Sequence, residues 1–281
     1  MSSLIIQHPQ LSNTSVRRFV SLIGRDPDRR KDSYALWRRV HIDGATLDRA
    51  ADEQGVDAEV VAPDLRLEQF RLAAFDMDST LITVECVDEI ADFAGRKAEV
   101  AAITEAAMRG EIADYDDSLR RRVALLSGLP ESTLLRVWEE RVRLTPGARD
   151  LVRAMKTAGL QLLLVSGGFS YFTSRLADSL GIEHVHSNVL EISEGRLTGK
   201  LLGPIVNAEA KRRALSETAL RIGCSLAQTI AVGDGANDLQ MMSISGLSVA
   251  YRAKPVVRNE TTHAINHCGL DSMLRFFEDT R

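Results

Sequence analysis

The chain has 281 residues, of which 44% are hydrophobic and 26% are charged, an ordinary composition for a globular protein of one large or two modest domains. The net charge of −4 argues against a nucleic-acid partner, which would require a basic surface, and three cysteines without a CxxC pair argue against a thiolate metal site. The first residues do not resemble a signal peptide and no apolar run approaches the ~18 residues of a membrane span, so we expect a cytoplasmic protein without membrane contact.

Residues 1–70 are expected to form a small α+β domain. Apolar patterns predict strands over residues 3–7, 35–41 and 56–61, with helices over 15–23 and 47–54. No cluster of residues in this segment indicates chemistry. A regulatory or dimerising module is one interpretation, which would make the protein a homodimer, and a purely structural role is the other.

Four short apolar runs follow, each of the length of a buried strand. They occupy residues 72–75, 161–165, 229–232 and 247–250, with helical patterns over 147–158, 170–180 and 208–222 between them. This alternation predicts an α/β fold with a Rossmann-like parallel sheet and helices on both faces. Ligands bind such sheets beyond the carboxyl ends of the strands. Because the first three runs end in polar clusters, we expect these clusters to converge on one site.

The stretch between the first and second runs is too long for one crossover helix. Gly and Pro residues divide it into helical patterns over 84–94, 97–109, 116–126 and 131–142. We therefore expect a helical cap insert at residues 84–145, which leaves residues 71–83 and 146–281 as the catalytic core. An insert directly after the first strand would lie over the site as a lid. A β-hairpin is predicted over residues 191–200.

Two acids, Asp76 and Asp78, directly follow the first apolar run. Alone, this spacing is most often a solvated turn, and Asp234 and Asp238 alone would be explained as helix caps. The position at a strand end changes that interpretation, because Ser166 and Asp234 occupy the ends of two further strands. The three segments together indicate a catalytic centre.

Residues 76–80 (DMDST) resemble the DxDx[ST] motif of the haloacid dehalogenase superfamily. Ser166 after an apolar strand is similar to the second motif of that superfamily, Lys211 to the third, and residues 233–238 (GDGAND) to the fourth. Four motifs in the right order are a specific signal. The resemblance implies the fold of that superfamily, with the cap inserted after the first core strand.

The resemblance is closer to one branch of the superfamily, the phosphoserine phosphatases, from residue 72 to about residue 277. It rests on Glu85, on residues 118–123 (SLRRRV), and on the sequences SGGF and GAND around Ser166 and Asn237. It implies hydrolysis of O-phospho-L-serine to L-serine and phosphate through an aspartyl-phosphate intermediate, the last step of serine biosynthesis. Transfer of the phosphoryl group to an amino alcohol such as homoserine is the alternative, because the same cap could hold either acceptor.

The resemblance also assigns roles in the reaction. Asp76 is the implied nucleophile and Asp78 the general acid and base, a role that requires a raised pKa. Mg²⁺ is the implied cofactor, bound by the carboxylates of Asp76 and Asp234 and by the backbone carbonyl of Asp78. Asp238 is implied to orient a metal-bound water from outside the ligand set. Lys211 offsets the negative charge of the phosphate and of Asp76.

The small-molecule substrate is expected to contact both core and cap. Ser166 and Gly167, with Lys211, would bind the phosphate through a hydroxyl, backbone N–H groups and a positive charge. Asn237 would contact the substrate or its phosphate. Glu85 would pair with the ammonium group of an amino acid and Arg122 with its carboxylate. These two complementary charges favour phosphoserine over a sugar phosphate.

Two details of the cap stay open. Successive helical residues point about 100° apart, so at most two of the three arginines at 120–122 can face the site, and alignment with the family selects Arg122. Residues 110–118 form a loop one residue longer than the family pattern. This departure leaves Met108 and Tyr115 open as walls of the pocket.

Overall fold

The computed structural model describes residues 2–108, 112 and 114–280, apart from the side chains of residues 107 and 108. The side chain of Met108, one of the two open pocket walls, therefore lies outside the described residues. So do residues 109–111 and 113 of the cap loop.

The first of two sheets is antiparallel, with strand order β2-β3-β1-β4. Its elements are β1 (Ser2–Gln7), α1 (Asn13–Ile23), β2 (Arg29–Lys31), β3 (Tyr34–Val40), α2 (Gly44–Gln54) and β4 (Asp57–Val61). The three predicted strands and two predicted helices are confirmed. The two helices cover one face, where Phe19 of α1 packs against Trp37 of β3. Strand β2 was missed, because its three exposed charged residues show no apolar alternation.

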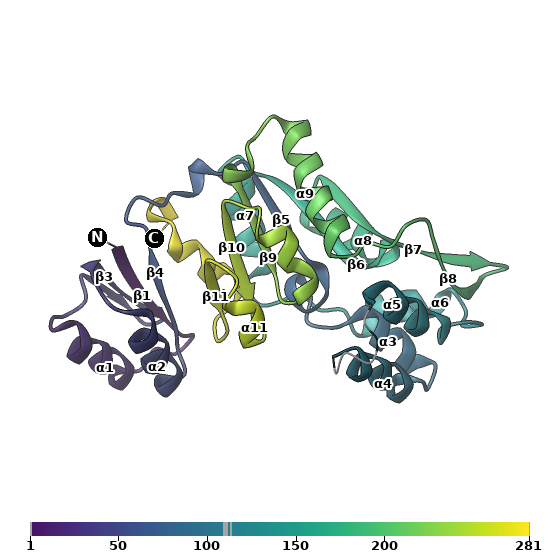
Figure 1. Ribbon diagram of the computed structural model, residues 1–281, viewed down its shortest axis with the longest axis horizontal. Helices are drawn as coiled ribbons and strands as arrows, with labels where there is room; N and C mark the ends of the chain where they lie inside the picture. The colour runs from purple at the N-terminus through teal and green to yellow at the C-terminus, as the bar shows by residue number, and fades with distance from the viewer. Residues whose placement is uncertain (1, 109–111, 113, 281) are drawn as a thin grey trace.

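The opposite face of this sheet packs on the C-terminal segment of the chain, beside which it lies in Figure 1. Ile5 and Leu36 belong to the same apolar cluster as Phe276. Asp57 on β4 is buried and accepts hydrogen bonds from the consecutive backbone N–H groups of residues 266–268, at 2.7, 3.1 and 3.0 Å. A buried carboxylate therefore fixes the small sheet to the larger unit.

The second sheet has the order β11-β10-β9-β5-β6-β7-β8, and only β8 runs antiparallel to its neighbour. Its strands are β5 (Leu72–Phe75), β6 (Gln161–Phe169), β7 (His184–Ser193), β8 (Arg196–Leu202), β9 (Thr229–Gly233), β10 (Leu247–Tyr251) and β11 (His263–Ile265). The four predicted runs are β5, β6, β9 and β10, and β7–β8 is the predicted hairpin. Strand β11 was not predicted, because three residues are too few to show a pattern.

Alternating side chains of the central strands face two layers of helices, which confirms the α/β fold. Phe75 packs with α7 (Ala148–Thr157) and α8 (Ser170–Leu180). Its neighbour Ala74 packs with α9 (Ala208–Ile222) and α10 (Leu239–Met242) on the other side. A short helix, α11 (Pro255–Arg258), follows β10.

Within the described part of residues 84–145, four helices form the cap, as the sequence patterns predicted. They are α3 (Cys86–Phe93), α4 (Lys97–Met108), α5 (Tyr115–Ala124) and α6 (Ser132–Glu140). An isolated antiparallel bridge between Ile82 and Leu144 brings together the segments that enter and leave the cap. Figure 1 shows the cap beside the β7–β8 end of the large sheet. Within the described ranges, no helix is long and apolar enough to cross a membrane.

Candidate active site

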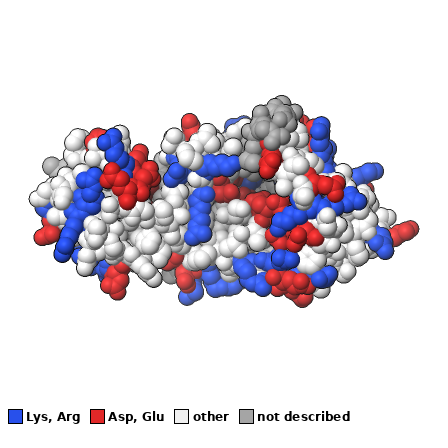
Figure 2. Space-filling view, turned by 90° about the horizontal axis from the view of Figure 1, so that it is seen from below, with Lys and Arg blue, Asp and Glu red and all other residues white. Residues whose placement is uncertain are grey.

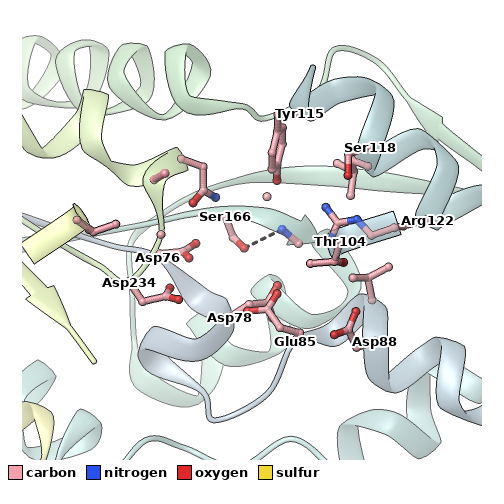
Figure 3. A pocket seen from close by; sticks show the side chains of 18 of the residues that line it. Asp76, Asp78, Glu85, Asp88, Thr104, Tyr115, Ser118, Arg122, Ser166 and Asp234 are labelled. Atoms are coloured by element: carbon pink, nitrogen blue, oxygen red, sulfur yellow. Dashed lines mark hydrogen bonds between the residues drawn. The ribbon is translucent and has the colours of Figure 1, made fainter. Parts of the chain in front are cut away.

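A pocket of about 670 Å³ lies between the cap and the carboxyl ends of β5, β6 and β9. Asp76, Ser166 and Asp234, which the sequence placed at three strand ends, all line it, as Figure 3 shows. Figure 2 shows carboxylates inside the central hollow of the molecule and basic side chains at its edges. The predicted convergence of the three polar clusters is therefore observed.

A buried ion triad lies beneath the floor of the pocket, which only its Asp76 lines. The Nζ atom of Lys211, on α9, lies 2.7 Å from Oδ1 of Asp76 and 2.7 Å from Oδ1 of Asp238. Burial alone would lower the pKa of Lys211, but the two carboxylates outweigh it and raise that pKa. Burial raises the pKa of Asp76 to about 7, opposed by Lys211 and assisted by Asp238. The lysine therefore stays charged and pins one oxygen of Asp76.

Asp234 lies beside this triad and completes an acidic cluster. One oxygen each of Asp76, Asp234 and Asp238 lies within 4.8 Å of the others. Burial, followed by the charges of Asp76 and Asp238, raises the pKa of Asp234 to about 8. The hydroxyl of Thr80 donates to Oδ1 of Asp234 at 3.1 Å. Mutual repulsion at this distance is what a bound cation would relieve.

Asp78 lies in the tight turn Met77–Leu81 that follows β5. Its Oδ1 accepts a hydrogen bond from the backbone N–H of Cys86 at 3.3 Å. Burial raises its pKa well above the usual range, and the charges of Glu85 and Asp76 add to that shift. A Cβ on Gly168 would lie 2.6 Å from the other oxygen, Oδ2. Glycine at 168 is therefore required for this carboxyl to occupy its position.

The loop after the apolar part of β6 presents the hydroxyl of Ser166, which accepts from the N–H of Gly168 at 2.9 Å. Asn188 of β7 fixes this loop through two hydrogen bonds of its side-chain amide. Its Nδ2 donates to the carbonyl of Gly167 at 2.7 Å, and its Oδ1 accepts from the N–H of Val206 at 2.8 Å. Asn188 was not among the predicted site residues, although asparagine is unfavourable in the middle of a strand and its presence there indicates a specific hydrogen-bonding role.

Glu85, which lies near Asp78, precedes α3 and accepts a hydrogen bond from the Ser79 hydroxyl at 2.6 Å. Burial raises the pKa of Glu85, and the Ser79 hydrogen bond opposes the shift. Ser79 adopts φ +56°, a strained conformation for a non-glycine residue. This strained turn positions the Ser79 hydroxyl against the Glu85 carboxylate.

Of the three adjacent arginines on α5, only Arg122 lines the pocket. Arg120 and Arg121 form exposed ion pairs with acids one turn earlier. The buried Nε of Arg122 has no hydrogen-bond partner within the described part of the chain. Of these three arginines, the cap helix therefore presents Arg122 to a ligand, which agrees with the expectation that at most two of them could face the site and with the choice of Arg122.

The structure places the remaining predicted residues as follows. Asn237 lines the pocket beside Asp234. Lys211 and Asp238 do not line it, and both are completely buried behind Asp76. Tyr115, which sequence analysis left open, does form a wall. Thr80 was not predicted as a site residue, and its contact with Asp234 spans 154 residues of sequence.

Three comparisons place these features among known proteins. Residues 73–243 match the family model described as haloacid dehalogenase-like hydrolase. The chain is 59% identical over 224 residues to the phosphoserine phosphatase of a Polaromonas species, a match that covers 78% of this chain and 95% of that protein.

Two solved structures are also similar. A probable phosphoserine phosphatase from Vibrio cholerae has a TM-score of 0.85 at 34% identity, with 99% of this chain and 87% of that one covered. A substrate-bound phosphoserine phosphatase complex has a TM-score of 0.70 at 35% identity, over 74% of this chain and 99% of that one.

Proposed function

The chain belongs to the haloacid dehalogenase-like hydrolase family, and from this premise we propose that it hydrolyses O-phospho-L-serine to L-serine and phosphate, the last step of serine biosynthesis. The observation that carries the proposal is that Glu85 and Arg122, two side chains of opposite charge, both line the pocket together with Asp76 and Asp78. The 59% identity to a phosphoserine phosphatase supports it. The alternative, transfer to an acceptor such as homoserine, has no support, because the relatives carry the name of a phosphatase.

In the first step, an oxygen of Asp76 attacks phosphorus and the bond to the serine oxygen breaks. Asp78 gives its proton to that oxygen, a role that its raised pKa favours. L-Serine leaves and the phosphoryl group stays on Asp76 as an acyl phosphate. In the second step, Asp78 takes a proton from water, the water oxygen attacks phosphorus, and phosphate and the Asp76 carboxylate are released.

The acidic cluster fits Mg²⁺, because it offers only oxygen donors. Hydrogen bonds from protein groups already occupy Oδ1 of Asp76 and both oxygens of Asp238. We therefore propose that Asp76 and Asp234 each bind the ion through the carboxylate oxygen that does not accept a hydrogen bond from the protein, and that the backbone carbonyl of Asp78 is a further ligand. Asp238 would support the site without contacting the ion. The ion would supply positive charge that lets a carboxylate approach a dianionic phosphate. Lys211 supplies part of that charge by itself.

Recognition of the amino acid rests on the cap. The Glu85 carboxylate would pair with the substrate ammonium and the Arg122 guanidinium with its carboxylate, as charge-assisted hydrogen bonds. Ser166 and Gly167 would hold the phosphoryl oxygens at the end of β6. The two charges of an α-amino acid thus meet two opposite charges of the protein.

A phosphate-release screen across phosphorylated amino acids and sugars tests the function. We expect phosphoserine to be preferred, Asp76→Asn to abolish release, and Arg122→Ala to raise KM for phosphoserine far more than for a sugar phosphate. Normal release by Asp76→Asn would refute the nucleophile. Equal losses on both substrate classes in Arg122→Ala would refute the carboxylate contact.

The division into residues 1–70, a core and a cap, the cytoplasmic location and a homodimer are further proposals. The buried Asp57 contact supports a structural docking role for residues 1–70. Deleting these residues tests the alternatives. An active monomer would favour a regulatory or dimerising module, and insoluble protein would favour the structural role.

A further inference from the structure

The hydroxyl of Tyr115 points into the pocket from the first residue of α5. Figure 3 shows it directed from the cap toward the loop at Ser166. A Cβ built on Gly167 would lie 2.2 Å from this hydroxyl oxygen and 3.4 Å from the ring carbon that carries it. The side chain of a cap residue therefore rests against the backbone that the proposed function assigns to phosphate binding.

This hydroxyl has no hydrogen-bond partner among the described residues, although its ring packs against the main apolar cluster. Because it lines the pocket, the hydroxyl is accessible to a ligand that enters there. Its charged neighbours are Lys211 and Arg122 on the positive side and Asp76 and Glu85 on the negative side. It lies between the nucleophile and the proposed amino-acid contacts.

The chemistry of the group selects its acceptor. Burial raises the pKa of Tyr115 to about 12, so the hydroxyl keeps its proton at working pH and is available as a donor. The oxygens brought to Gly167 by a bound substrate are those of the phosphoryl group, if the proposed function is correct. The same contact explains why residue 167 is a glycine, because any side chain there would displace the Tyr115 hydroxyl.

We propose that Tyr115 is a further phosphate-binding residue, whose hydroxyl donates a hydrogen bond to the bound phosphoryl group from the cap side. This inference rests on the proposed function for the position of the phosphate. The Tyr115 hydroxyl would add a hydrogen-bond donor on the cap side of the phosphoryl group, opposite Ser166 and Gly167. This donor is in place only when the cap covers the site.

The test is Tyr115→Phe, which removes one oxygen atom. The measurements are kcat and KM for phosphoserine and the competitive inhibition constant of inorganic phosphate, which carries no amino-acid part. A hydrogen bond to a charged acceptor predicts about a 10- to 100-fold loss of kcat/KM and a weakening of phosphate inhibition by about tenfold. The matched control is Tyr171→Phe, outside the pocket, which should leave both values unchanged. A loss below about twofold in both measurements would overturn the proposal, and so would a loss confined to phosphoserine, since the hydroxyl would then serve the amino-acid end.

A second variant tests the contact itself. Gly167→Ala should be strongly impaired in the wild-type background, because its Cβ would collide with the hydroxyl at 2.2 Å. In the Tyr115→Phe background the nearest remaining atom is 3.4 Å away, an ordinary contact, so the added loss should be small. Equal losses in both backgrounds would refute the position of the hydroxyl. If the wild-type enzyme released no phosphate from phosphoserine, the proposed function would fail, while phosphate binding would still test the inference.

Discussion

Replacement of Lys211 by methionine should destabilise the protein, because it removes the positive charge that lies between two buried carboxylates. Lys211 and Asp238 have no exposed surface and Asp76 has 5%. Both contacts of Nζ are 2.7 Å long. Methionine keeps most of the side-chain volume, so the loss is one of charge and hydrogen bonds rather than of packing.

Breaking a buried ion pair by removing one partner costs about 3–5 kcal/mol. One kcal/mol shifts the midpoint of thermal unfolding by about 2–4 °C for domains of this size, so a fall of about 10 °C is expected. The deficit should grow with pH. A carboxyl group whose pKa is raised by folding costs stability as the pH rises from its unfolded value of 3.8 through its folded value, about 7 for Asp76 with Lys211 present. Lys211 lowers the pKa of Asp76, so without it this loss continues to higher pH, and the deficit relative to wild type grows above about pH 7.

The assay is thermal unfolding without metal at about pH 5 and about pH 8, with Lys200→Met, an exposed lysine, as the control. Excess Mg²⁺ should recover part of the lost stability but not the activity, because it neutralises the same carboxylates without restoring the position of Asp76. A Lys211→Met midpoint within about 2 °C of wild type at the higher pH would refute the reasoning.

Three further predictions concern the metal, the general acid and the small sheet. The affinity for Mg²⁺ should rise between about pH 6 and about pH 8, because Asp76 and Asp234, with pKa values of about 7 and 8, must lose protons to bind it. An affinity that calorimetry finds to be the same across this pH range would contradict the prediction. Gly168→Ala should lower kcat by about 10²-fold or more, because the added Cβ would displace the carboxyl group of Asp78. Release of phosphate at the wild-type rate, measured by stopped flow, would argue against Asp78 as the general acid. Asp57→Ala should lower the free energy of unfolding by about 2–4 kcal/mol, because buried N–H groups lose their acceptor. Limited proteolysis should then cleave near residue 62 more rapidly, and an unchanged pattern would exclude this docking role.

Local patterns predicted much of the fold. The apolar runs became β5, β6, β9 and β10, since a buried parallel strand needs a continuous apolar segment whatever its partners. Helical periodicity located the cap helices to within a few residues. The strand ends at Asp76, Ser166 and Asp234 had to meet, because parallel strands place their carboxyl ends at one edge of the sheet.

Local sequence patterns did not predict the short or charged strands. β2 has three exposed charged residues and β11 has three residues in all, and both are strands only because a neighbour supplies the hydrogen bonds. The docking of the small sheet could not be predicted from the sequence either, since Asp57 accepts hydrogen bonds from backbone N–H groups about 210 residues away.

Sequence alone determined the chemical groups of this protein: two acids after β5, a lysine on α9, an acid pair after β9, and a glutamate and an arginine in the cap. Tertiary structure alone decided how they interact. Lys211 and Asp76 are 135 residues apart, and the 2.7 Å contact that ties them exists because packing buries both. Burial also raises the pKa of Asp78 and leaves the Tyr115 hydroxyl facing Gly167. The physical reason is that a residue's type and spacing are local properties, whereas dielectric environment and contact are properties of the folded chain.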